Sequence, residues 1–267
     1  MIEFDGKKTR DRIMEELKIK VARLPRKPVL AVVWAGDNLV SARYVEAKKK
    51  AAEKIGVGIR VFKFVKNAES IDIINKIKEL NEDKKIDGIL VQLPLPENFR
   101  LSDVIDAISP EKDVDALRFC GQRSCTFRPP VSMAILEAVK ESGVSIFDSV
   151  IALIGRGFLV NDPLYRILVE YDCDVRVVDE QVPNIGTVTQ DADIVISATG
   201  KPDLIKPPMI KNGVVLIDAG TTEVKGSLRG DVDPLSYLKS KFYTPVPGGI
   251  GPVTVAMLFK NLIEGTK

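Results

Sequence analysis

Apolar runs of strand length alternate with amphipathic stretches in the N-terminal part of the chain. Three runs have the length of buried strands and end near glycine or proline: 28–34, 61–65 and 86–93. Three other stretches repeat apolar residues at helical spacing: 7–24, 41–55 and 71–80. Strands separated by helices in this order predict a parallel sheet with helices packed on its faces.

A second alternation follows a segment, 118–130, that has no clear periodicity. It predicts helices and strands in this order: helix 132–142, strand 149–154, helix 163–171, strands 174–178, 193–197 and 214–217, and a closing helix from Pro252. The pattern therefore predicts an α/β protein of two domains, each a mostly parallel sheet with flanking helices. We place a first domain at 1–125, completed by the helix 252–267, and a Rossmann-like dinucleotide-binding domain at 126–251.

Composition excludes several kinds of partner and chemistry. Lys and Arg number 39 and Asp and Glu 37, with no basic cluster, which argues against a nucleic-acid partner. The chain lacks a signal-like N-terminus and any apolar run of membrane length, so we expect a cytoplasmic protein without membrane contact. Histidine is absent, so proton transfer has to use Lys, Asp, Glu, Tyr, Cys or water. The three cysteines lack metal-ligand spacing, and we predict no metal site.

Lys48 shares the apolar side of the 41–55 helix. On a helical wheel it lies beside Tyr44, Val45, Ala51, Ala52 and Ile55. The other charges lie on the flanks or the opposite side: Glu46, Lys49, Lys50, Glu53 and Lys54. One interpretation is a lysine whose stem covers the edge of the core while its ammonium reaches water. The other is an ammonium in a partly dry cleft, where its pKa falls and it acts as a base.

Polar residues close two segments of the first domain. Gln92 ends the apolar strand 86–93, where its amide needs a partner: a facing lysine, or the backbone of the following loop. Asp113 and Asp115 stand two apart, so one carboxylate can bind a ligand while the other caps backbone or faces solvent.

The first strand of the second domain runs into Gly155-Arg156-Gly157. Glycine lets the backbone approach a pyrophosphate, and the next helix N-terminus favours negative charge, which indicates a dinucleotide site. A tight turn without a ligand is the alternative, because Val160 takes the third glycine position of the fingerprint. Further small or polar residues end strands of the same sheet: Asp179, Thr199, Gly200 and Thr221. The segment 244–252 is rich in proline and glycine, and is either a rigid connector or backbone that lies against a flat ligand.

Five segments in this order resemble the bifunctional methylenetetrahydrofolate dehydrogenase/cyclohydrolase family. They are Tyr44-Val-Glu-Ala-Lys48, Asp87-Gly-Ile-Leu-Val-Gln-Leu-Pro-Leu-Pro96, Pro110-Glu-Lys-Asp-Val-Asp115, Gly230-Asp-Val232 and Thr244-Pro-Val-Pro-Gly-Gly-Ile-Gly-Pro-Val-Thr-Val-Ala256. The resemblance spans nearly the whole chain. It implies oxidation of 5,10-methylenetetrahydrofolate with NADP and hydrolysis of the methenyl product to 10-formyltetrahydrofolate. It also implies a cleft between the domains and a homodimer formed through the cofactor domain.

The resemblance also implies residue roles. Lys48 is the catalytic lysine, Gln92 orients it, Tyr44 stacks on the folate and Asp115 binds the pterin. Substrate contacts further include Leu93, Pro94, Pro247, Gly248 and Gly249. The expected cofactor contacts are Gly155, Arg156, Gly157, Asp179, Thr199, Gly200 and Thr221.

Three places depart from the family pattern. Pro130-Val-Ser132 stands where Cys-Thr-Pro is usual, and Ala116 replaces a glycine. Gly157 and Asn161 stand where serine and a later glycine are usual. Asp179 favours NAD because a carboxylate repels a ribose phosphate, whereas Arg156 favours NADP; we predict NADP, with NAD as the alternative.

Two other functions fit part of the sequence. A two-domain dehydrogenase of the shikimate type also pairs a lysine with an aspartate, but it does not require the spacing of Tyr44 and Lys48. A non-catalytic dinucleotide sensor has no need of a lysine on an apolar helix face opposite Gln92 and Asp115.

Overall fold

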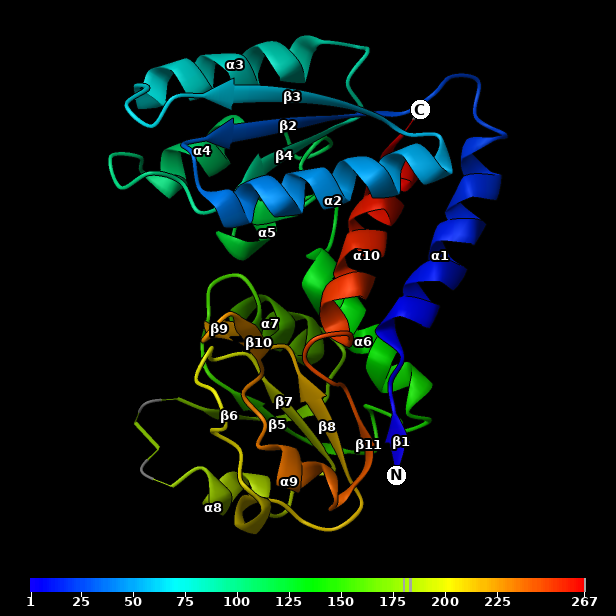
Figure 1. Ribbon diagram of the computed structural model, residues 1–267, viewed down its shortest axis with the longest axis vertical. Coiled ribbons are helices and arrows are strands. Elements are labelled where there is room, and N and C mark those ends of the chain that lie inside the picture. Colours follow the sequence, from blue (N-terminus) through cyan, green and yellow to red (C-terminus); the bar gives the residue numbers. More distant parts are fainter. Residues whose placement is uncertain (180, 183, 267) are drawn as a thin grey trace. The chain divides into compact units, whose positions relative to one another are not determined.

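The computed structural model describes residues 1–179, 181–182 and 184–266, which form two compact units (Figure 1). The first unit comprises residues 11–130 and 255–266, and the second comprises residues 1–10 and 131–254. Among the described residues, no helix is long and apolar enough to cross a membrane.

The first unit is built on a parallel sheet with the order β3-β2-β4. Its strands are β2 (Val29–Ala35), β3 (Gly58–Phe64) and β4 (Gly88–Gln92). Its helices are α2 (Leu39–Ile55), α3 (Ser70–Glu82), α4 (Leu101–Ala107) and α5 (Leu117–Cys120). Two further helices cross the limits of the units: α1 (Gly6–Val21) and α10 (Ile250–Gly265).

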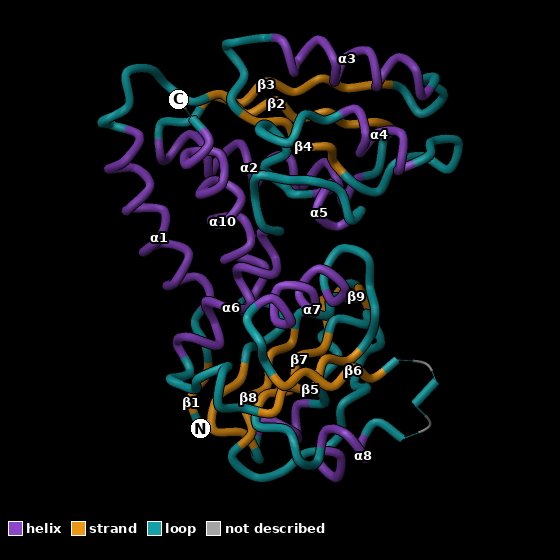
Figure 2. The backbone as a smooth tube through the Cα atoms, turned by 180° about the vertical axis from the view of Figure 1, so that it is seen from behind, coloured by secondary structure: helices purple, strands orange, loops and turns teal. Residues whose placement is uncertain are grey.

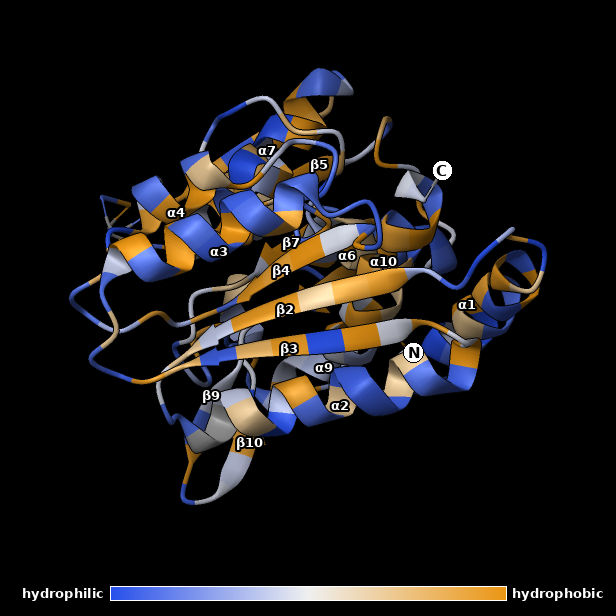
Figure 3. Ribbon diagram, turned by 90° about the horizontal axis from the view of Figure 1, so that it is seen from above, coloured by the Kyte–Doolittle hydropathy of each residue, from blue (hydrophilic) through white to orange (hydrophobic). Residues whose placement is uncertain are grey.

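The two faces of this sheet carry different helices, as Figure 3 shows for α2 and α3. Ile89 and Val91 of β4 pack in one core cluster with Ile73 and Ile77 of α3. Side chains alternate along a strand, so Gln92 lies on the opposite face, towards α2. That alternation brings a polar side chain of β4 to the helix that carries Lys48.

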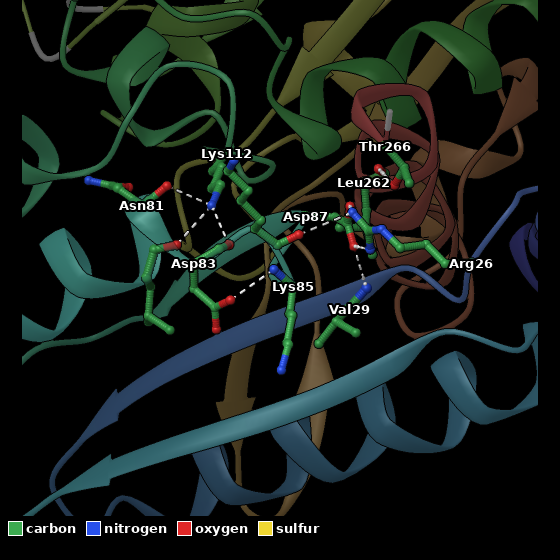
Figure 4. Close-up of polar contacts among 11 residues, drawn as sticks. Arg26, Val29, Asn81, Asp83, Lys85, Asp87, Lys112, Leu262 and Thr266 are labelled. Carbon is green, nitrogen blue, oxygen red and sulfur yellow. Dashed lines mark hydrogen bonds and ion pairs between the residues drawn. The ribbon is translucent and has the colours of Figure 1, made fainter.

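Partly buried polar contacts secure the opposite, N-terminal edge of the sheet (Figure 4). Asp87 precedes β4, accepts two hydrogen bonds from the Arg26 guanidinium at 2.6 and 2.8 Å, and accepts the backbone N–H of Val29 at 2.8 Å. Lys112 donates to three carbonyls at the end of α3, those of Leu80, Asn81 and Asp83. These contacts fix the start of β2 and β4 and the end of α3, and leave the carboxyl edge for ligands.

The second unit holds a six-stranded parallel sheet with the order β1-β11-β8-β7-β5-β6 (Figure 2). Its strands are β1 (Ile2–Glu3), β5 (Val150–Ile154), β6 (Asp174–Val178), β7 (Ile194–Ser197), β8 (Val214–Asp218) and β11 (Ser240–Tyr243). Its remaining elements are α6 (Pro130–Glu141, whose first residue belongs to the first unit), α7 (Asn161–Glu170), α8 (Gly186–Thr189), η1 (Pro207–Met209), the hairpin β9 (Thr222–Val224) and β10 (Ser227–Arg229), and α9 (Pro234–Tyr237). The chain goes from β5 to β6 on one side and returns to β7 on the other. This reversal is a topological switch point, where open α/β sheets bind ligands.

The predicted α/β class with two parallel sheets is confirmed. Several short elements were not predicted: β1, β11, α4, α5, α8, α9, η1 and the β9–β10 hairpin. The segment 118–130 contains most of α5, so it is not wholly irregular. The first ten residues belong with the second unit, because β1 pairs with β11 and Phe4 is buried beside Phe242.

Candidate active site

Lys48 and Gln92 meet at the carboxyl edge of the first sheet. The Lys48 Nζ donates to the Gln92 Oε1 at 2.9 Å. The Gln92 Nε2 donates to the Leu93 carbonyl at 2.7 Å, so this amide serves both partners considered for it. The backbone bond fixes which amide atom is the acceptor, and the acceptor then holds the ammonium in place.

The helical wheel predicts the environment of Lys48 correctly. Val45, Ala52 and Ile55 are buried beneath the same side of α2, and Lys48 is half-buried. The other charged residues of the pattern are exposed: Glu46, Lys49, Lys50, Glu53 and Lys54. Burial lowers the pKa of Lys48, and the negative charge of Asp115 opposes part of that shift. A lysine in this position reaches its neutral form at a lower pH than a solvated one.

Asp113 and Asp115 lie in different surroundings, and Asp113 is the one that caps backbone. Asp113 is fully buried and accepts the backbone N–H groups of Leu117 and Arg118 at 3.1 and 2.7 Å. It therefore caps the start of α5. Asp115 is half-buried; burial raises its pKa, and the positive charge of Lys48 lowers it. Asp115 is the carboxylate of the two that acts on Lys48.

Ala116, between these aspartates and α5, adopts a left-handed backbone with φ of 56° and is fully buried. This conformation favours glycine, which accounts for the family's usual residue at this position. Alanine keeps the turn and leaves both aspartates in place.

Three more predicted substrate residues lie close in the sequence to Lys48 or Gln92. Tyr44 stands one turn before Lys48 on α2 and is 49% exposed. Leu93 and Pro94 directly follow Gln92 and are joined by a cis peptide bond. The first unit thus brings a lysine, an amide, a carboxylate and an aromatic ring to one edge of its sheet.

The glycine turn of the second unit needs its first glycine. Gly155 directly follows β5 with φ of 98°. A Cβ there would lie 3.0 Å from both Asn161 Nδ2 and Thr199 Cγ2. Asn161 is fully buried and donates to the Ile154 carbonyl at 2.5 Å, closing the turn at the start of α7. Gly157 has no such requirement, since its nearest neighbour would be 3.7 Å away.

Arg156 and Asp179 lie in the turns after β5 and β6. Arg156 forms an ion pair with Asp162 at 3.1 Å, lies over the Tyr165 ring, and remains 52% exposed. The strand β6 ends at Val178, so Asp179 lies one residue beyond it, half-buried, and accepts the backbone N–H of Gln181. A negatively charged ligand has to compete with Asp162 for Arg156.

Other predicted cofactor residues follow β7 and β8. Thr199 and Gly200 lie in the loop after β7, and the Gly200 carbonyl accepts the Thr222 hydroxyl at 2.6 Å. Thr221 is exposed, directly before β9. These loops follow strands beside the switch point, so their backbone suits a dinucleotide bound over Gly155.

The segment Pro247–Gly249 belongs to the second unit and leads into α10. The Gly249 N–H donates to the Pro245 carbonyl at 2.8 Å, and Val246–Pro247 is a cis peptide bond. Gly6 packs so closely here that a Cβ would lie 1.9 Å from the Gly249 carbonyl oxygen. The loop therefore forms a tight turn whose backbone packs directly against the backbone of Gly6.

Sequence reasoning assigned no role to the most extensive buried carboxylate contacts of the second unit. Asp231 accepts three hydrogen bonds from Ser197 and Thr199, and Asp218 accepts three backbone N–H groups. The available signal was Gly230-Asp231-Val232, an acidic residue between a glycine and an apolar side chain.

Comparisons with known proteins match both parts of the chain. The family model for the catalytic domain of tetrahydrofolate dehydrogenase/cyclohydrolase matches residues 4–115, and the model for its NAD(P)-binding domain matches residues 129–267. The bifunctional protein FolD of Hydrogenobaculum sp. is 40% identical over 272 residues, which cover 99% of this chain and 98% of that protein. The FolD protein of Halothermothrix orenii is 38% identical over 275 residues, with 99% and 97% covered.

Solved structures give the same result. The bifunctional FolD methylenetetrahydrofolate dehydrogenase/cyclohydrolase of Campylobacter jejuni is 32% identical with a TM-score of 0.95, covering 100% of this chain and 98% of that one. FolD of Trypanosoma brucei, complexed with NADP cofactor and inhibitor, is 32% identical with a TM-score of 0.92, covering 99% and 97%. Both domain models match and full-length relatives share the fold, so this chain belongs to the tetrahydrofolate dehydrogenase/cyclohydrolase family.

Proposed function

We propose that this protein oxidises 5,10-methylenetetrahydrofolate to 5,10-methenyltetrahydrofolate with NADP and hydrolyses that product to 10-formyltetrahydrofolate. The observation that carries the proposal is the Lys48–Gln92 hydrogen bond beside Asp115, in a chain of this family. A dinucleotide sensor has no use for a lysine buried and oriented in this way.

The hydrolytic step suits a lysine of lowered pKa. Water adds to the electrophilic methenyl carbon, one carbon–nitrogen bond breaks, and a proton is released. Neutral Lys48 takes the proton from the attacking water, while Gln92 holds the amine by its side-chain oxygen. The Asp115 carboxylate accepts paired bonds from the donor edge of the pterin, and the exposed ring of Tyr44 stacks on the folate.

The residues of the second unit fit a dinucleotide. Gly155 provides a backbone cradle that a Cβ would fill, next to the N-terminus of α7. Half-exposed Arg156, in the glycine turn, would hold a ribose phosphate in exchange for its ion pair with Asp162, and Thr199, Gly200 and Thr221 follow β7 and β8 of the same sheet. Bound at this turn, NADP would supply the acceptor for the hydride that leaves the methylene carbon. The protein's contribution to that step is alignment, which needs no histidine.

An absorbance assay for methenyltetrahydrofolate formation tests the proposal. We expect turnover with NADP, a lower kcat/KM with NAD, and hydrolysis of added methenyltetrahydrofolate without any nicotinamide. Arg156→Ala should lower the preference for NADP, because the planar cation at the glycine turn is lost. Folded protein that turns over with neither cofactor would instead support the sensor.

We also propose a homodimer formed through the second unit, as the family resemblance implies, in the cytoplasm. Light scattering of the purified protein tests the assembly, with twice the chain mass of 29.4 kDa as the expected result. A mass of one chain at micromolar concentration would contradict it.

A further inference from the structure

Asp231 accepts three hydrogen bonds on one carboxylate oxygen, one from Ser197, the last residue of β7, and two from Thr199 in the loop that follows. Its Oδ2 accepts the Ser197 hydroxyl at 2.7 Å, the Thr199 backbone N–H at 2.6 Å and the Thr199 hydroxyl at 2.9 Å. Asp231 is 1% exposed and Ser197 is fully buried. These bonds hold the end of β7 and the start of the loop from inside the unit, because Asp231 and Ser197 are both buried.

The position of this carboxylate is fixed independently of the loop. The Asp231 N–H donates to Asp218 Oδ1 at 3.1 Å, and the Asp231 carbonyl accepts the Ile205 N–H at 3.0 Å. Asp218, 1% exposed, also accepts the backbone N–H groups of Gly220 and Val232. The backbone of Asp231 is therefore anchored on the end of β8 and on the segment around Ile205 by contacts that do not involve the loop.

A glycine makes room for the anchored carboxylate. A Cβ on Gly220 would lie 2.1 Å from Asp231 Oδ1. That oxygen is buried and has no hydrogen-bond partner among the described residues. With Gly220 packed against Oδ1, the hydrogen bonds that the Asp231 carboxylate accepts within the described part of the chain all go to Oδ2.

The contacts continue from Thr199 to the glycine turn. A Cβ on Gly155 would lie 3.0 Å from Thr199 Cγ2, so the threonine methyl group packs against the turn that follows β5. β5 and β7 are neighbours at the switch point of the sheet. A rotation of the Thr199 side chain would therefore alter both the loop after β7 and the glycine turn after β5, where the dinucleotide is expected to bind.

We infer that Asp231 is a positioning residue for the cofactor: it holds the loop Ser197–Gly200, and through Thr199 the glycine turn, in the conformation that binds NADP. This inference rests on the proposed function. Three convergent donors require an acceptor without hydrogens of its own, and a carboxylate oxygen meets that need better than a neutral amide.

The test compares NADP binding with an activity that uses no nicotinamide. Asp231→Ala should raise the Kd for NADP, measured by isothermal titration calorimetry, at least tenfold, and Asp231→Asn should raise it less because one acceptor oxygen remains. Ser197→Ala, which removes the fully buried hydroxyl that donates to Asp231 and is not among the expected cofactor contacts, should also weaken binding. Hydrolysis of methenyltetrahydrofolate, assayed without NADP, should stay at the level of the unaltered protein in all three.

Asp233→Asn is the matched control. Asp233 lies two residues further on, is half-buried, and caps α9 by accepting the Leu235 N–H, a role that asparagine performs as well. It should leave both the Kd and the hydrolysis unchanged. Unaltered NADP affinity in folded Asp231→Asn and Ser197→Ala would overturn the inference. So would a loss of hydrolysis parallel to the loss of affinity, because that result indicates general destabilisation. If the unaltered chain itself fails to bind NADP, the proposed function falls, and the inference with it.

Discussion

Lys48 and Lys49 are adjacent residues of α2 in different surroundings. Lys48 is half-buried and bonded to Gln92, whereas Lys49 is exposed and pairs with Glu46 at 3.7 Å. Lys48→Met should abolish hydrolysis of methenyltetrahydrofolate and keep the fold, because methionine approximates the lysine stem without its amine. Lys49→Met should retain full activity. Undiminished hydrolysis by Lys48→Met, after subtraction of the uncatalysed rate, would rule out the proposed role.

The lowered pKa of Lys48 has a consequence for the pH profile. Neutral amine forms as pH rises through that pKa, so hydrolysis should increase with pH and level off below the ordinary lysine range near pH 10.4. Asp115→Asn removes the charge that holds the pKa up, so the rising limb should move to lower pH. The measurement is kcat against pH for both proteins. If the rising limb of the kcat profile lies at the same pH in Asp115→Asn, a group other than Lys48 controls it.

Substitutions of the two aspartates before α5 should have different effects, one on folate binding and the other on folding stability. Asp115→Ala removes a charge-assisted contact to the pterin, which costs about 1.5–3 kcal/mol of folate binding. Asp113→Ala removes the acceptor of two buried backbone N–H groups, which costs about 1–3 kcal/mol of folding stability. Folate Kd and urea unfolding measured on both variants distinguish the effects. A larger loss of affinity in folded Asp113→Ala would reverse the two roles.

At the scale of helices and strands, long periodic segments were predictable and short ones were not. The apolar side of α2 gave the burial of Val45, Ala52 and Ile55, and hence the position of Lys48. By contrast, β1 has two residues and exists because it pairs with β11, far along the chain. No local period can reveal an element whose stabilisation comes from a distant strand.

The candidate sites were predictable to a similar extent. One polar residue at the end of an apolar strand predicted a facing lysine or the loop backbone as the partner of Gln92, and the amide contacts both. The contact between Asp231 and the loop after β7 was not predictable, because it joins residues that only the sheet order brings together. Hydrogen bonds between distant segments leave no spacing rule in the sequence.

The glycine turn after β5 gives a prediction at this scale. In Gly155→Ala, the alanine would have to adopt a backbone φ of 98°, and its Cβ would lie 3.0 Å from atoms of Asn161 and Thr199. Gly143 also has positive φ, 72°, but a Cβ there meets nothing within 4 Å. Gly143→Ala should therefore cost about 1 kcal/mol of stability and spare cofactor binding, whereas Gly155→Ala should also weaken NADP binding. Equal NADP affinity in the two variants, by calorimetry, would contradict this account of the turn.

At the scale of the molecule, α10 completes a unit whose other residues lie far earlier in the sequence. Asn261 of α10 is 9% exposed and donates to the carbonyls of Val114 and Arg128, both at 2.9 Å. Asn261→Ala should lower the free energy of unfolding in urea by about 1–3 kcal/mol, because two buried carbonyls lose their donor. Asn67→Ala, at an exposed position, is the control and should change little. Equal stabilities would mean that α10 contributes no anchoring through Asn261.

The pairing of β1 with β11 sets an order of events during synthesis on the ribosome. Residues 1–10 emerge early, yet the strand beside which they lie, Ser240–Tyr243, is translated only after nearly all of both units. The first unit has the complementary requirement, since it awaits residues 255–266. Neither unit can reach its final contacts while most of the chain is still being made, so nascent chains should expose to chaperones the edge of β8, with which β11 later pairs, and the surface that α10 later covers.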